Sequence, residues 1–239
     1  MTAPPHSRAE APYWSLAGLA EGARRCGAMV PGTMVFAAAY GTLAAQKGLT
    51  LTEATLMSAL VFGGASQLVA MEVWKSPITL ASVVSLAVVT AIVNARFILM
   101  GATLRPWFGA LPPWQVYPAL NSTVDATWLV ATRYRAEGGS DASVFVGAGL
   151  ALWVVWVGSA IPGYLLGAFI VDPKQFGFDL MLPIFFAAMF VPLWRGARRA
   201  TGWVIAGAVA LIVSYVVPGW WFIVAGALTG SVAGAFIDE

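Results

Sequence analysis

The chain has 239 residues, of which 59% are hydrophobic and only 10% are charged, and its formal net charge is +2. A soluble domain carries about 25% charged residues, so this composition would leave most of a soluble surface apolar and prone to aggregation. We therefore expect an all-α polytopic integral membrane protein, because helices satisfy their own backbone hydrogen bonds in lipid.

The same inventory excludes several classes of function. His6 and Cys26 are the only histidine and the only cysteine of the chain. Together they cannot supply a zinc site, haem ligation or a histidine-based catalytic triad. We expect no metal, no cofactor and no catalytic residue, and hence no enzyme. Nucleic acid is not an expected partner, because the sequence has no basic patch with interleaved aromatic residues.

Residues 1–25 are the most polar part of the sequence, and we expect them to form a cytoplasmic tail. Within them, residues 13–25 combine aromatic and aliphatic side chains with Glu21, Arg24 and Arg25. This mixture fits a short helix at the membrane interface, and it fits a flexible tail equally well. Residues 26–239 are expected to form a single transmembrane transporter domain.

Eight apolar stretches follow the tail, separated by short polar breaks. Their expected ranges are 26–45, 54–74, 78–101, 119–133, 143–171, 179–194, 202–217 and 220–236. Since one crossing takes about 20 apolar residues, several of these stretches reach only part of the way, and we expect about 7–8 transmembrane or half-membrane helices with breaks.

Positive charges give the expected orientation of these stretches. With a cytoplasmic N-terminus, the cytoplasmic loops carry nine Lys or Arg residues and the outer loops carry three, which are Lys47, Arg105 and Lys174. An excess of Lys and Arg in short loops marks the cytoplasmic side. Both termini are therefore expected in the cytoplasm.

Prolines inside the apolar stretches predict irregular helices. Each proline lacks a backbone donor and clashes with the preceding helical turn. The predicted helix breaks are Pro31, Pro162, Pro183 and Pro218. The sequences VPGTMVFAAAYG (30–41) and IPGYLLGAFIV (161–171) also resemble each other, which suggests an internal repeat whose two copies run in the same direction.

The segment FGGASQ, residues 62–67, places polar groups in the middle of an apolar stretch. One interpretation is a broken helix whose exposed backbone binds a substrate, as in several transporters. The other is close helix packing at the glycines, with the serine and glutamine hydrogen-bonded to a neighbouring helix. Under the first interpretation the candidate substrate-binding residues are Gly63, Gly64, Ala65, Ser66 and Gln67.

A second polar group lies in the third and fourth stretches. Asn94 is a further candidate for substrate binding, and Arg96 and Asp125 are expected at similar depth, where they could pair. Such a pair is either a structural strut or a site where Asp125 titrates and couples proton movement to transport. Trp153 and Trp156 either line a pocket or pack in the core.

Several motifs resemble those of one transporter family. They are FGGASQLVA (62–70), NARFILMGATLRPWF (94–108), VPGTMVFAAAYG, the acidic segment before LVATRYR, the WxxW of the fifth stretch, and FGFDLMLPIFFAAMF (176–190). The sequence is similar in these motifs to the AzlC-type family of branched-chain amino-acid permeases. Two positions depart from the family pattern, because Phe97 stands where relatives often have His and Ala126 where they often have Glu.

The resemblance implies a multi-pass protein of the inner (plasma) membrane that forms the large subunit of an AzlC/AzlD-type exporter. With a small AzlD-type membrane subunit, it would act as a secondary transporter that exports leucine, isoleucine, valine and sometimes methionine. Two other functions compete with this one. They are a non-transporting scaffold subunit of a membrane complex and a carrier for another small apolar solute.

Overall fold

The structure is a computed structural model that describes residues 11–74, 77–167, 169, 180, 187, 194, 196–217 and 221–237. The described residues contain helices and no strand, as the composition predicts. The first half of the chain holds α1 (Leu16–Arg25), η1 (Gly27–Met29), α2 (Val30–Gln46), α3 (Leu51–Val61), α4 (Gly64–Val73) and α5 (Leu80–Asn94). The second half holds α6 (Arg96–Phe108), α7 (Pro113–Leu120), α8 (Asp125–Ala136), α9 (Ser143–Gly167), α11 (Ala197–Val216) and α12 (Trp221–Ile237).

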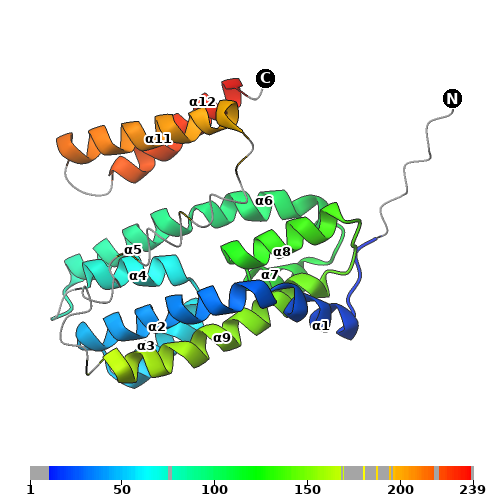
Figure 1. Cartoon of the computed structure of the whole chain (residues 1–239), viewed down its shortest axis with the longest axis horizontal. Coiled ribbons are helices and arrows are strands. Elements are labelled where there is room, and N and C mark those ends of the chain that lie inside the picture. Colours follow the sequence, from blue (N-terminus) through cyan, green and yellow to red (C-terminus); the bar gives the residue numbers. More distant parts are fainter. Residues whose placement is uncertain are drawn as a thin grey trace.

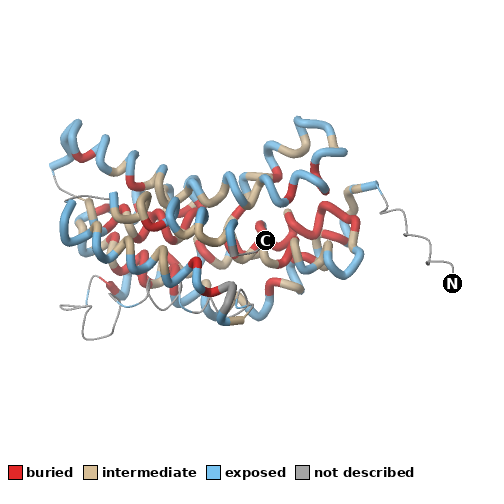
Figure 2. The backbone as a smooth tube through the Cα atoms, turned by 90° about the horizontal axis from the view of Figure 1, so that it is seen from above, coloured by how far each residue is buried: buried red, intermediate tan, exposed pale blue. Residues whose placement is uncertain are grey.

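In the part of the chain that the structure describes, three continuous helical segments are long and apolar enough to cross a membrane. They are Leu16–Gln46, Leu80–Phe108 and Ser143–Gly167. The buried parts of the backbone gather toward the middle of the fold (Figure 2). Many residues with large apolar side chains are exposed. Ile98, for example, is 75% exposed. An outer surface of this kind is stable only against lipid, so the chain is a membrane protein.

Helices α1 and α2 run parallel to α9 along their common length (Figure 1). A Cβ atom on Gly22 would lie 2.0 Å from the carbonyl oxygen of Val144, and one on Gly41 would lie 2.1 Å from that of Ala160. Glycine at these positions lets the two backbones touch, which is the usual way helices associate in lipid. The segments 30–41 and 161–171 of the suggested repeat thus begin on neighbouring helices that point the same way.

The start of this helix pair is fixed by polar contacts. Residues 16–25, for which a helix and a flexible tail were both open, form α1, and the Ser15 hydroxyl caps it by accepting from Gly18 N at 2.9 Å. The same hydroxyl donates to the carboxylate of Asp141, which also accepts from Ser143 N at 2.9 Å. One buried carboxylate therefore links the amino-terminal ends of both parallel helices, directly at α9 and through Ser15 at α1.

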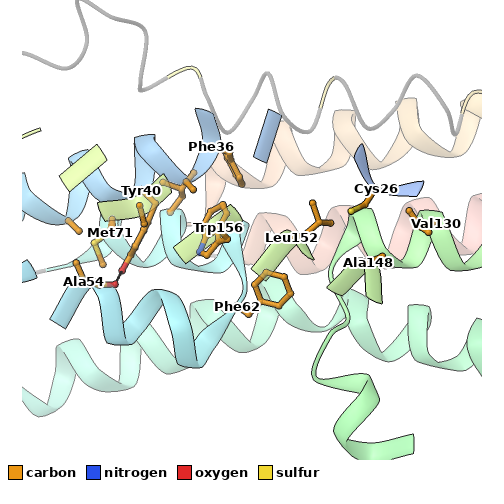
Figure 3. Close-up of a cluster of buried hydrophobic side chains, with 14 of the residues drawn as sticks. Cys26, Phe36, Tyr40, Ala54, Phe62, Met71, Val130, Ala148, Leu152 and Trp156 are labelled. Atoms are coloured by element: carbon orange, nitrogen blue, oxygen red, sulfur yellow. Dashed lines mark hydrogen bonds between the residues drawn. The ribbon is translucent and has the colours of Figure 1, made fainter. Parts of the chain in front are cut away.

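The second apolar stretch is not one continuous helix. The helix breaks at Phe62, whose φ of 38° is left-handed, and at Gly63. Tyr40 of α2 donates to the carbonyl of Ala54 on α3 at 3.0 Å, and Met71 of α4 lies beside the same two residues (Figure 3). Both arms therefore lie along the same half of α2, and the stretch expected at 54–74 is a hairpin of two half-length helices.

The fourth stretch is a hairpin of the same kind at the opposite end of the fold. Gln115 of α7 accepts from Trp14 Nε1 at 2.7 Å, and Glu137 after α8 pairs with Arg25. Both arms thus begin and end near α1, and the turn between them reaches the middle of the fold. The expectation of a single span at 119–133 is corrected, because one α-helix ends at Leu120 and the next begins at Asp125.

Helices α5 and α6 connect the two ends of the fold. They form one segment with a single irregular residue at Ala95, and they run past the expected end at residue 101 to Phe108. The α5 half packs against α4, and Trp107 near the end of α6 donates to the carbonyl of Ser140 at 3.1 Å. The two hairpins consequently enter from opposite ends, and their turns lie between the long helices (Figure 1).

The predicted proline breaks have different outcomes. Pro31 follows the short 3₁₀ turn η1 at the start of α2, so helix geometry does change there. Pro162 lies inside α9, which is helical without interruption from Ser143 to Gly167. The break expected at Pro162 is therefore wrong, because one missing hydrogen bond is tolerated in a helix that packs closely on its neighbour. Pro183 and Pro218 lie outside the described residues, as does most of the stretch 179–194.

The last two helices, α11 and α12, pack on each other through small residues. A Cβ atom on Gly226 would lie 2.7 Å from the carbonyl oxygen of Ala206, and one on Gly230 would lie 2.5 Å from the Cβ of Ala206. Because glycine and alanine are small, the backbones of the two helices approach each other closely at these positions. The apolar stretches expected at 202–217 and 220–236 therefore form an antiparallel pair of short helices.

Candidate substrate pocket

A pocket lies where the turns of the two hairpins meet the long helices. Its empty space is about 500 Å³ with the open mouth included. The two hairpins contribute Phe62, Gly64, Ala65, Val124, Asp125 and Ala126 to its lining. The long helices contribute Thr33, Phe36, Arg96, Phe97, Leu152 and Trp156. Most of this lining is apolar, and its charged groups come from two residues.

Arg96 and Asp125 form an ion pair in the wall of the pocket. Arg96 Nη2 lies 2.9 Å from Asp125 Oδ2, and the side chains are 24% and 8% exposed. Asp125 is the first residue of α8, where the positive end of the helix dipole favours a carboxylate. The turn before it is fixed by Thr127, whose hydroxyl donates to the carbonyl of Ser122 at 2.7 Å. The acid is therefore positioned by the local fold of the hairpin.

The amino-terminal end of α4 forms another polar part of the wall. Gly63 precedes this helix and no side chain caps it. The first intrahelical bond runs from Gln67 N to the carbonyl of Gly63 at 2.8 Å, so the amides of Gly64 and Ala65 have no acceptor within the helix. Free amides at a helix start favour an anionic group, and these two residues line the pocket.

An aromatic group forms the apolar side of the pocket. The rings of Trp156 and Phe36 meet edge to face with centroids 5.6 Å apart, and the rings of Trp156 and Tyr40 are stacked at 6.1 Å (Figure 3). Gly64 fits directly against this group, because an added Cβ would lie 2.7 Å from Trp156 and 2.9 Å from Phe36. The size of the pocket therefore depends on where the indole ring lies.

The structure brings four of the predicted site residues into the pocket, namely Gly64, Ala65, Arg96 and Asp125. Gly63 forms the turn beside it and does not belong to its lining. Ser66 and Gln67 are buried behind the wall, where Ser66 donates to the carbonyl of Gly63 at 2.8 Å and Gln67 accepts from Trp156. Asn94 also lies outside the lining, and its Oδ1 has no hydrogen bond among the described residues.

Both interpretations of the FGGASQ segment thus describe part of it. The broken helix is present, and it exposes the backbone of Gly64 and Ala65 to the pocket. The glutamine makes the hydrogen bond to a neighbouring helix that the packing interpretation expects, whereas the serine bonds within its own segment, to the carbonyl of Gly63. Of the two tryptophans, Trp156 lines the pocket, whereas Trp153 donates to the carbonyl of Ala59 at 2.9 Å.

The apolar wall carried little signal in the sequence. Phe36, Leu152 and Val124 look like any other core residue of a membrane helix. Phe97 and Ala126, the two positions that depart from the family pattern, both line the pocket directly beside the ion pair. Among the described residues, no three His, Cys, Asp or Glu side chains lie close enough together to hold a metal ion.

Comparison with known proteins gives one match. A family model described as AzlC protein matches residues 28–170, a range that contains both hairpins and every residue of the pocket. No curated protein matches the chain. No solved structure matches it either.

Proposed function

The chain belongs to the AzlC family, whose members are transport-related membrane proteins, and from this premise we propose that it is the large subunit of a secondary transporter for branched-chain amino acids. The proposed substrates are leucine, isoleucine and valine, with methionine as a further one. A carrier of this kind has no reaction to catalyse. Its task is to bind the amino acid inside the membrane and to expose it to each side in turn.

The observation that carries the proposal is an ion pair in a mostly apolar pocket between two hairpins of half-length helices. A free amino acid has one carboxylate and one ammonium group. The carboxylate fits Arg96 and the free amides at the start of α4, and the ammonium group fits Asp125. A zwitterion bound in this way adds no net charge to the pocket, which keeps the electrostatic cost of binding low.

The apolar wall suits the side chain of such a substrate. Phe36, Leu152 and Trp156 offer aliphatic and aromatic surface next to the ion pair. Burying branched aliphatic side chains against this surface is favourable, but one methylene changes binding by only about 1–3 kcal/mol. Several branched-chain amino acids are therefore expected to share the site.

We infer the orientation from the positive charges near the ends of the fold. The end of the fold at which α1 begins carries four arginines, namely Arg24, Arg25, Arg133 and Arg135. Arg105 on α6 lies toward the same end, although the sequence predicted it on the outer side. Lys47 lies at the other end. The excess of arginine favours a cytoplasmic N-terminus. We further propose that the inner membrane holds the protein, that a small AzlD-type subunit completes it, and that transport runs outward.

The test is efflux of labelled leucine from liposomes that contain the chain together with its small partner subunit. We expect efflux from the complete pair and a loss of at least about tenfold in Asp125→Asn, because the ammonium group loses its carboxylate. Gly101→Ala is the matched control, since a Cβ at Gly101 meets nothing within 4 Å. Unchanged efflux in Asp125→Asn would show that the pocket is not the substrate site and would favour the scaffold function.

A further inference from the structure

The glutamine behind the pocket holds the aromatic wall in place. Gln67 is fully buried on α4, and its Oε1 accepts from Trp156 Nε1 at 3.0 Å. Trp156 is 3% exposed and belongs to α9, far from Gln67 in the chain. This hydrogen bond therefore links the first hairpin to the long helix on the other side of the pocket.

The position of the indole ring is set by three further contacts. It stacks on Tyr40, it meets the edge of Phe36, and the edge of its six-membered ring lies close to Gly64. Stacking and edge contacts are weakly directional, so they hold the ring only loosely within its own plane. The hydrogen bond to the indole nitrogen is directional and adds the constraint that fixes the ring in that plane.

We propose that Gln67 is a positioning residue that sets the size limit of the pocket by fixing Trp156, and that it does not touch the substrate. The inference deepens the proposed function and rests on it for the identity of the substrate. Gln67 then determines which side chains fit, whereas Arg96 and Asp125 bind the groups common to all amino acids. Loss of the hydrogen bond should change selectivity among amino acids more than it changes affinity for the smallest of them.

The experiment compares KM values for valine, leucine and phenylalanine in liposomes with wild type, Gln67→Met and Gln67→Glu. Methionine keeps the length of the side chain and removes the acceptor, whereas glutamate keeps an acceptor oxygen. We expect Gln67→Met to improve phenylalanine relative to valine by about three- to tenfold, and Gln67→Glu to stay closer to wild type. An equal rise of KM for all three substrates would instead show direct contact with the amino acid and overturn the proposal.

A second variant removes the same bond from the other side. Trp156→Phe lacks the indole N–H, and in its background Gln67→Met should have no further effect on the ratio of KM values. If Gln67→Met does not reach the membrane, Gln67→Leu replaces it, because leucine also lacks the acceptor and leaves the ring of Trp156 unchanged. A wild-type ratio in Trp156→Phe contradicts the proposal.

A measurement without transport separates this inference from the proposed function. Ala126→Cys in a Cys26→Ser background places one thiol in the pocket, and its labelling by methyl and benzyl methanethiosulfonate reports the space available. We expect Gln67→Met to raise benzyl relative to methyl labelling by about threefold or more. This result would support the positioning role even if leucine is not transported, and equal ratios in both proteins would overturn it.

Discussion

The guanidinium of Arg96 lies 2.9 Å from the carboxylate of Asp125, at the place where the junction of α5 and α6 meets the first turn of α8. The pair joins a helix that runs the full length of the fold to the turn of a hairpin that reaches only halfway. It lies in the pocket wall, so either a strut or a substrate site can be built from it. Stability and transport, measured on the same variants, separate these two roles.

Removing both charges should restore stability without restoring transport. Asp125→Asn and Arg96→Gln each leave one charge without this partner, and for a fully buried pair that loss costs about 3–5 kcal/mol. We expect both single variants to have a lower Tm than wild type and the double variant to lie between them and wild type. Leucine efflux should stay at least about tenfold below wild type in all three. Recovery of efflux in the double variant would show that the ion pair has a structural role and does not bind the substrate.

Gly64 is the position at which the smallest change should close the pocket. A methyl group there would lie 2.7 Å from Trp156 and 2.9 Å from Phe36, so the two rings must move. We expect Gly64→Ala to weaken leucine binding by about tenfold or more, as measured by equilibrium binding to the purified pair. Gly101→Ala should bind like wild type, because its surroundings are open. Equal affinity in both variants would contradict the geometry of the pocket.

Close packing of α2 on α9 makes a separate prediction about stability. A Cβ on Gly163 would lie 2.3 Å from the carbonyl oxygen of Ala38, and backbone atoms cannot move aside as a side chain can. Gly163→Ala is expected to destabilise the protein by about 1–3 kcal/mol. Gly158→Ala, on the open side of the same helix, should be neutral or stabilise it by up to about 1 kcal/mol. Thermal unfolding in detergent compares the two, and similar losses in both would argue against this helix pair.

The link between α1 and the end of α8 should depend on pH. A hydrogen bond from Arg25 lowers the pKa of Glu137 below its ordinary value. A group with a lowered pKa contributes stability above the ordinary value, about 4.3 for glutamate, and loses that contribution as pH falls through the folded pKa. The Tm difference between wild type and Glu137→Gln should therefore be largest near neutral pH and should shrink on acidification. A difference that does not change with pH would contradict the pairing.

The sequence offered a helix break within 54–74 as one of two interpretations of FGGASQ, and the helix is interrupted at Phe62 and Gly63. It did not indicate the direction of the chain after that break. Two half-length helices have the same length and hydropathy as one crossing, so composition cannot distinguish a hairpin from a span. The return direction is set by packing, above all by Tyr40, which contacts α3 and α4 from one helix. The sequence nevertheless predicted that α2 and α9 run in the same direction, and the structure agrees. Each hairpin had been counted as one crossing, and two extra crossings leave the direction of α9 unchanged.

The polar part of the pocket was easier to find than its apolar part. Arg96 and Asp125 stood out because charges are rare in apolar stretches, and they do pair. Ser66 and Gln67 stood out for the same reason, yet they face away from the lining, since the rotation of α4 about its own axis is set by packing. Trp156 could not be distinguished from a core residue, because its role depends on the cavity beside it.

The central claim is that an amino acid binds between the turns of the two hairpins, and protection from labelling tests it most directly. The thiol of Ala126→Cys, in a Cys26→Ser background with the partner subunit present, is alkylated with and without saturating leucine. We predict that leucine slows alkylation by about fivefold or more, and that a thiol at Gly101→Cys on α6 reacts at the same rate in both conditions. Equal rates at Ala126→Cys with and without leucine, in protein shown to bind leucine, would place the substrate elsewhere and contradict the account.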